Sequence, residues 1–146
     1  MITIRETKKI HTDKIEQSLS KALSFMREKY PDVNFHVDYI FGGGSRSRYF
    51  RNDNSGNFNG KYKTPTVFIS CRTRWITYKK ASLKVYADFS VGVELQILLA
   101  LIHELTHHAQ YELGRLKGSE VETTKNELEY CEKYEPKTYK KLITIK

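Results

Sequence analysis

The sequence lacks the features of a disulfide-stapled or membrane-spanning chain. Only two of its 146 residues are cysteines, Cys71 and Cys131, and they form no Cys-x-x-Cys pair. A disulfide framework is therefore excluded, and a reducing compartment is expected. The longest apolar run, at 97–102, is far shorter than the ~20 residues that cross a bilayer. The N-terminus shows no apolar segment typical of a secretory signal, so we expect a cytoplasmic protein that does not contact membranes.

Acidic residues are scarce between residues 42 and 84, where Asp53 stands against ten lysines and arginines. The whole chain has a net charge of +8, so the excess lies in this span and the remainder is near neutral. Aromatic residues alternate with the basic ones, a mixture suited to phosphate and base-stacking contacts. Two interpretations remain open: a surface that contacts nucleic acid, or a solvated basic face over ordinary core aromatics.

Apolar spacing predicts three helices in one globular domain that covers residues 1–146. Steps of three and four residues indicate helices over 12–30 and 91–113. The second of these is apolar nearly all round in its first half and should be central, with Gly114 as its stop. Ser119 opens a capping box that starts a third helix, running to about residue 134.

Alternating apolar residues predict strands over 33–41, 66–72 and 83–89. Between the first two lies a long stretch rich in Gly, Ser, Asn and Arg, which is expected to be a functional or mobile loop. In an alternative interpretation, some of this stretch forms a hairpin around residues 53–56. The fold class predicted is α+β. An N-terminal helix and a small, mainly antiparallel sheet would pack on the central helix 91–113, and a C-terminal helix would follow.

The central helix carries the sequence His103-Glu104-Leu105-Thr106-His107. Histidines four residues apart lie on one face of a helix and can bind one Zn²⁺. Glu104 is close enough to reach a water molecule without being a ligand. Zinc would lower the pKa of that water and polarise a substrate carbonyl. Glu104 would take the water's proton and deliver it to the leaving amine.

An incidental match on a surface helix is the alternative interpretation. Residues 100–102 and 105–106 are all uncharged, whereas a surface helix would interleave charge there. Burying the side chains of His103, Glu104 and His107 in so apolar a helix is costly without a partner such as a metal. The metal site is therefore favoured over the incidental match. His108 points ~100° away and is expected at the surface or beside the ligands. His11 and His36 are expected to be structural.

Catalytic zinc usually keeps three protein ligands, and no histidine follows His108. Gln110 and Leu113 occupy the positions where metzincins need Gly and His, which excludes that class. A carboxylate of the helix after residue 119 is therefore expected as third ligand.

Several glutamates of that helix are candidates. Glu122 is used by the capping box, and Glu120 suits the positive helix N-terminus. Glu127 lies beside the inward face formed by 124, 128 and 131 and is the favoured ligand, with an ordinary surface glutamate as the alternative.

Over residues 100–130 the sequence resembles the gluzincin family of zinc peptidases, and the chain is similar to minimal single-domain versions. The likeness rests on the His103–His107 motif, followed twenty residues later by Asn126-Glu127. It implies His103, His107 and Glu127 as zinc ligands and Glu104 as general base. The family's downstream His or Tyr that steadies the oxyanion has no clear match. Three tyrosines remain open for that role: Tyr130, Tyr134 and Tyr139.

The order of helix, strands and motif helix also resembles SprT-like metallopeptidases, some of which act on DNA-bound proteins. Their third histidine is missing here. A nucleic-acid-associated protease, or a binding module with a metal site, is therefore the alternative to a peptidase that hydrolyses protein or peptide substrates. In that alternative the basic span 42–84 would bind the nucleic acid.

Zincins pair an extended substrate with an edge strand facing the cleft, and 66–72 is the candidate strand. Cys71 and Arg72 at its end are candidate substrate-binding residues, and Arg72 with Arg74 would favour acidic substrates. Peptide deformylases use the same motif with a cysteine as third ligand. The residues around Cys71 differ from that family's, so a buried free cysteine is favoured.

Overall fold

The computed structural model describes residues 2–4, 12–42, 47–50, 64–70, 76–80, 83–87, 92–115 and 119–144. Within them the fold is α+β, as predicted. Helices and strands follow one another in this order: β1 (Ile2–Ile4), α1 (Thr12–Lys29), β2 (Asp38–Gly42), β3 (Arg48–Phe50), β4 (Thr66–Ser70), β5 (Ile76–Lys80), β6 (Leu83–Ala87), α2 (Gly92–Glu112), α3 (Glu120–Tyr134) and α4 (Pro136–Thr144). No helix in this part of the chain is long and apolar enough to cross a membrane.

The main sheet is mixed, so the prediction of a mainly antiparallel sheet is wrong. Its strand order is β1-β2-β4-β3, with β2 parallel to both β1 and β4 and only β3 antiparallel to β4. The strands β5 and β6 form a separate antiparallel pair. The error has a local cause: β1 and β3 have three residues each, too few for an alternating pattern. The α1 crossover between β1 and β2 makes those two strands parallel.

Strand β4 lies inside the sheet, which contradicts its assignment as the edge strand that pairs with substrate. Residues Thr66–Ser70 pair with β2 on one side, and Thr66–Phe68 pair with β3 on the other. Strand β3 comes from the stretch predicted to be a loop. It ends the strand order, next to α2, which contacts both β3 and β4.

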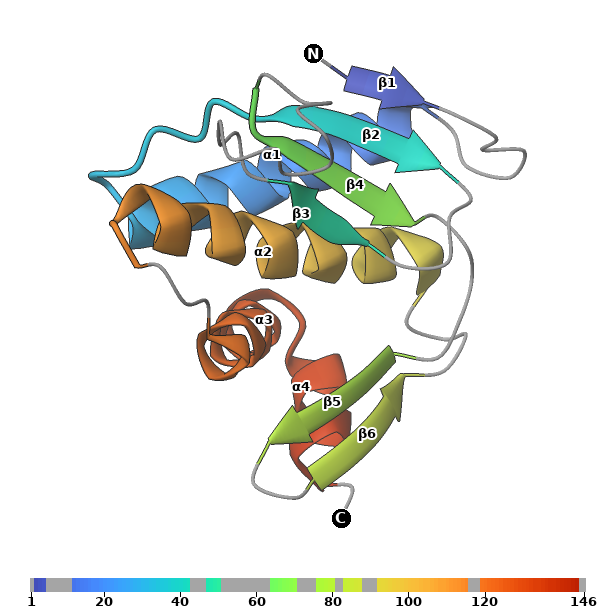
Figure 1. The fold of residues 1–146 in the computed structure, drawn as a ribbon. Coiled ribbons are helices and arrows are strands. Elements are labelled where there is room, and N and C mark those ends of the chain that lie inside the picture. Colours follow the sequence, from blue (N-terminus) through green and yellow to red (C-terminus); the bar gives the residue numbers. More distant parts are fainter. Residues whose placement is uncertain are drawn as a thin grey trace.

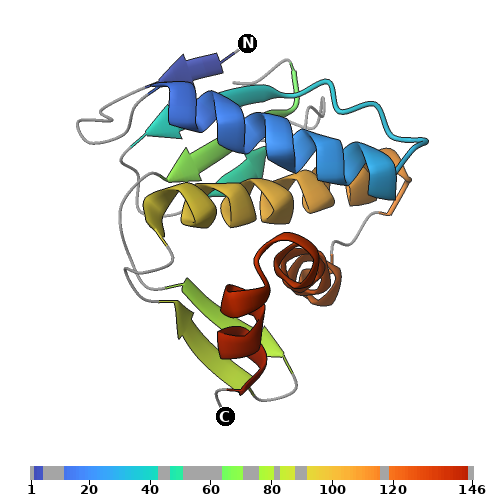
Figure 2. The same cartoon turned by 180° about the vertical axis from the view of Figure 1, so that it is seen from behind.

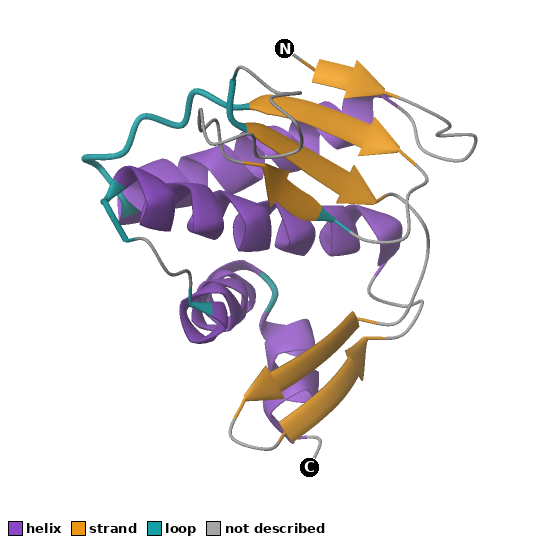
Figure 3. Cartoon of the chain, in the orientation of Figure 1, coloured by secondary structure: helices purple, strands orange, loops and turns teal. Residues whose placement is uncertain are grey.

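Helices α1 and α2 lie side by side on one face of the sheet (Figures 1 and 2). The other side of α2 contacts α3. Helix α3 in turn contacts α4 and β5, and α4 packs against β6 (Figure 3). Because α2 is covered from several directions, its residues 95–99, 101 and 102 are buried, in agreement with its apolar sequence. The buried apolar residues of α2 are Leu95, Ile97, Leu98, Leu99, Leu101, Ile102, Leu105 and Ala109.

Two helix ends bring α2 and α3 together. Helix α2 ends in a Schellman motif: Gly114, at φ +80°, donates to Tyr111 O, and Arg115 donates to Gln110 O. Ser119 caps α3, since its side chain accepts from the backbone of Glu122. Gly114 as the stop of α2 and Ser119 as the cap of α3 are thus confirmed. Helix α4 was missed because Pro136, which suggested a stop, occupies the first position of a new helix, where proline is favoured.

Candidate metal centre

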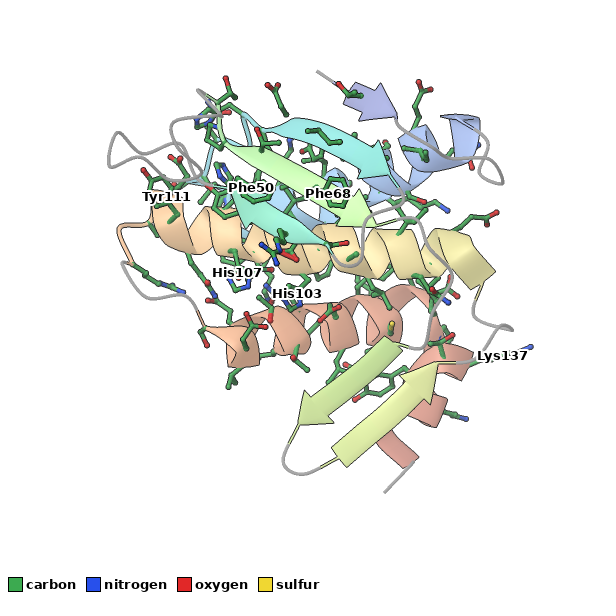
Figure 4. All side chains as sticks on the ribbon, turned by 45° about the vertical axis from the view of Figure 1, so that its right-hand side comes forward. Phe50, Phe68, His103, His107, Tyr111 and Lys137 are labelled. Carbon is green, nitrogen blue, oxygen red and sulfur yellow. The ribbon has the colours of Figure 1, made fainter. Side chains whose placement is uncertain are left out.

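The two motif histidines lie next to each other on the side of α2 that faces α3 (Figure 4). Their ring centroids are 5.1 Å apart, and the side chains of His103 and His107 are 27% and 21% exposed. The helical repeat accounts for this placement, because residues four apart stack on one face. The pair is thus partly open to solvent, while the helix on which it stands is buried.

Glu120, in the first turn of α3, faces the Nε2 atoms of both histidines. Its Oε2 lies 3.1 Å from Nε2 of His103, and its Oε1 lies 2.8 Å from Nε2 of His107. The three residues offer one ligand atom each, and these atoms lie within 4.8 Å of one another. Two imidazole nitrogens and one carboxylate oxygen therefore converge between α2 and the first turn of α3. The site is close to solvent, since the Glu120 side chain is 72% exposed.

The opposite nitrogen of each ring is held by a second oxygen. Nδ1 of His103 lies 3.4 Å from Oε2 of Glu127, and Nδ1 of His107 lies 3.0 Å from Oε1 of Gln110. An N–H on each Nδ1 satisfies these contacts and leaves the Nε2 atoms for another partner. Metal-binding histidines in proteins are commonly oriented in this way by a carboxylate or carbonyl behind them.

The oxygens around the two histidines favour a positive charge on the cluster. Every ring nitrogen of the two histidines faces an oxygen, at 2.8 to 3.4 Å. A neutral imidazole has a single N–H, so a neutral pair would leave two lone pairs against the Glu120 carboxylate. Burial lowers the pKa of His103, but the hydrogen bond to Glu127 and the charges of Glu127, Glu104 and Glu120 raise it to about 9. His103 therefore holds a proton more strongly than an ordinary histidine does.

Glu104 is the buried carboxylate beside this pair. Its side chain belongs to the interior of the protein, at 7% exposure, and its charge acts on the neighbouring His103. It lies among the motif residues without being one of the three that offer ligand atoms to a common point.

The sequence singled out Glu127, and the structure places it against Nδ1 of His103, behind the ring. Glu120, interpreted from sequence as a helix-terminus charge, is the residue in front of both rings. Both carboxylates come from the face of α3 that meets α2, two helical turns apart. A signal for Glu120 existed in the sequence, since it directly follows the N-cap Ser119, close along the chain to the end of α2.

Glu122 does not complete a capping box with Ser119. The backbone N–H of Ser119 instead donates to Oε1 of Gln110, at 3.1 Å. The Glu122 carboxylate accepts from Gln110, Arg115 and Tyr30. Burial raises the pKa of Glu122, but these hydrogen bonds and the Arg115 charge outweigh it and hold the pKa below its usual value. Glu122 thus ties α3 to the rest of the fold, away from the histidines.

His108 is fully buried, so the expectation that it lies at the surface or beside the ligands is wrong. Its Nδ1 bonds the Tyr49 hydroxyl at 2.9 Å, and its Nε2 lies 3.2 Å from Asn34 O. Burial lowers its pKa. His36 and Glu112 lie near enough to form a second possible metal group with it. However, both nitrogens of His108 already have partners, so His108 serves to hold β3 against α2.

Cys71, Arg72 and Arg74 lie outside the described residues, as does the stretch 51–63 of the basic span, including the optional hairpin. The predictions of substrate contacts and of nucleic-acid binding for 42–84 therefore stay predictions. Of the three tyrosines considered for oxyanion stabilisation, Tyr130 packs edge-on against Phe25 in the core. Tyr134 is stacked at a tilt beside Tyr130, and Tyr139 hydrogen-bonds to Glu132.

The chain was compared with known proteins in three ways. No family model matches it, and no curated protein and no solved structure was found to be similar to it. The case for a function therefore rests on the chemistry of the cluster formed by α2 and α3.

Proposed function

We propose that the protein is a zinc-dependent peptidase whose centre is the pair His103 and His107. The observation that carries the proposal is the arrangement of oxygens around this pair. The Nδ1 atoms contact oxygens of Glu127 and Gln110, and both Nε2 atoms face the Glu120 carboxylate. Positive charge stabilises this arrangement, either as protons on the rings or as a metal ion between the Nε2 atoms and the carboxylate. Two imidazoles and a carboxylate are a donor set that Zn²⁺ takes in catalytic sites.

In this proposal His103, His107 and Glu120 hold the metal. Glu127 and Gln110 orient the two rings by accepting from their Nδ1–H groups. When bound, zinc would act as a Lewis acid that polarises a carbonyl and makes a water molecule more acidic. The exposure of Glu120 and the partial exposure of the two rings leave room for a substrate to approach from solvent.

Glu104 is the proposed general base. It is buried beside His103, where removal of water strengthens its interactions. It would accept a proton from the attacking water and pass it to the leaving amine. Positioned proton transfer of this kind contributes typically 10²–10⁴-fold to a rate.

Glu104→Gln tests catalysis apart from metal binding. We expect the variant to fold, to retain about one zinc per chain and to lose roughly 10²-fold or more of its cleavage of an unstructured protein substrate such as casein. Glu129→Gln, on α3, is the matched control and should keep full activity. Near-wild-type cleavage by Glu104→Gln would remove Glu104 from the mechanism, and a wild-type protein that binds no zinc would end the proposal.

Separate variants of Glu120 and Glu127 test which carboxylate is the third ligand. Glu120→Ala removes the group in front of both rings, so we expect the larger loss of zinc affinity. Glu127→Ala removes the acceptor behind His103, which should cost about 10–100-fold. Competition with a chromophoric chelator measures both dissociation constants. A much larger loss in Glu127→Ala would restore the gluzincin-like assignment of Glu127, with Glu120 as a flexible surface charge.

A further inference from the structure

Gln110 lies in the last turn of α2, three residues after His107, and is buried at 1% exposure. Its side-chain amide contacts His107 of the same helix, Ser119 at the N-cap of α3, and Glu122 in the first turn of α3. Its Oε1 accepts from Ser119 N at 3.1 Å and contacts Nδ1 of His107 at 3.0 Å. Its Nε2 donates to Ser119 O at 3.0 Å and to Oε1 of Glu122 at 2.9 Å.

These partners determine which way the amide of Gln110 points. The backbone N–H of Ser119 can only donate, whereas Ser119 O and the Glu122 carboxylate accept. Oxygen and nitrogen of an amide are assigned from such partners. The reversed amide would set like groups against each other at three contacts. Because Oε1 therefore faces His107, Nδ1 of His107 must carry the proton.

The same amide also positions the first turn of α3. Ser119 is bonded to Gln110 through both its N–H and its C=O, and Glu120 is the next residue. Glu120 contributes the two oxygens that face Nε2 of His103 and of His107. One side chain thus controls the orientation of a histidine and the location of the carboxylate opposite it.

We propose that Gln110 is a positioning residue for the metal centre, acting in two ways. It holds the proton of His107 on Nδ1, which leaves Nε2 for the metal, and it docks the N-terminus of α3 so that Glu120 faces both rings. This inference rests on the proposed zinc site. Its consequence is that zinc binding and the docking of α3 are coupled, and such coupling is reciprocal.

Gln110→Leu removes the amide and keeps an apolar side chain of similar size in the buried position. We expect its zinc affinity to fall about 10–100-fold, the usual effect of losing a partner behind a metal ligand. Thr106→Val is the matched control, because Thr106 lies in the same helix and bonds Asn126 of α3 without touching a histidine nitrogen. The control should lose stability, and its zinc affinity should fall clearly less than that of Gln110→Leu, because the contacts of Gln110 with Ser119 and His107 remain.

Two further measurements separate positioning from a general loss of packing. In wild-type protein, zinc should slow hydrogen exchange of the first α3 amides, and in Gln110→Leu that protection should be much smaller. Nitrogen-15 NMR of the zinc-loaded wild type should show His107 protonated at Nδ1 with a slowly exchanging proton. In Gln110→Leu that proton should exchange fast.

A rescue experiment keeps the test valid if Gln110→Leu does not fold. Gln110→Glu sets a carboxylate against Glu122, and adding Glu122→Gln restores a donor between the two positions. We expect the double variant to recover zinc affinity relative to Gln110→Glu alone. If wild-type protein binds no zinc, the proposed function and this inference both fail. If the wild type binds zinc and Gln110→Leu binds it equally well, or the double variant shows no rescue, Gln110 has no positioning role while the proposed function stands.

Discussion

Raising the pH from 6.5 to 9 should destabilise the metal-free protein by about 3 kcal/mol through His103. In the folded protein the pKa of His103 is about 9, against 6.5 for an ordinary histidine. A group whose folded pKa is raised binds more protons in the folded state, so it stabilises the fold below pH 6.5. That contribution is lost as the pH rises toward 9. The shift converts at about 1.4 kcal/mol per pH unit.

Urea unfolding of chelator-treated protein at half-unit pH steps measures this loss. Zinc should abolish it, because the metal takes the place of the proton on Nε2 and the stability of the loaded protein should change little over this range. The buried thiol of Cys131 has its pKa raised from 9.0 to about 12, so its own destabilising effect begins only at the upper end of the window, near pH 9, where the unfolded thiol ionises. His36→Gln, at an exposed histidine, is the control and should keep the slope.

His103→Gln in its metal-free form should lose most of the slope. If wild-type stability is flat between pH 6.5 and 9, His103 does not take up the proton that the oxygens around it favour. An identical slope with and without zinc would show that proton and metal do not compete for the same nitrogens. Either result would contradict the charge argument on which the metal centre depends.

Two other changes test the surroundings of the centre. Gly114→Ala should cost about 1–2 kcal/mol in urea unfolding, because alanine is strained at φ +80° although no atom lies within 4 Å of the added Cβ; zinc content should be unchanged, and a neutral effect would contradict the αL requirement. Tyr49→Phe should cost about 1–3 kcal/mol by leaving Nδ1 of the buried His108 without its donor. An unchanged unfolding midpoint would mean that the Tyr49–His108 bond does not hold β3 in place.

Local periodicity was enough to identify the helix that carries the motif. The apolar residues of α2 and the four-residue spacing of His103 and His107 predicted a buried helix with two rings on one face, and the structure has both. The end of α2 and the beginning of α3 were also predictable from local sequence, since Gly114 and Ser119 act through backbone conformation and neighbouring N–H groups. Such features depend on residues within a few positions of one another, so the sequence determines them by itself.

Tertiary structure decided which carboxylate stands in front of the histidines. Glu120 and Glu127 occupy the same face of α3, and helical spacing alone does not say which of them reaches the Nε2 atoms. The answer depends on where α3 docks, which Gln110 controls through contacts with Ser119. Neighbouring residues in the sequence likewise did not predict the parallel strand pairing or the burial of His108 against Tyr49. Each depends on segments far apart in the chain, whose meeting is set by packing of the whole domain.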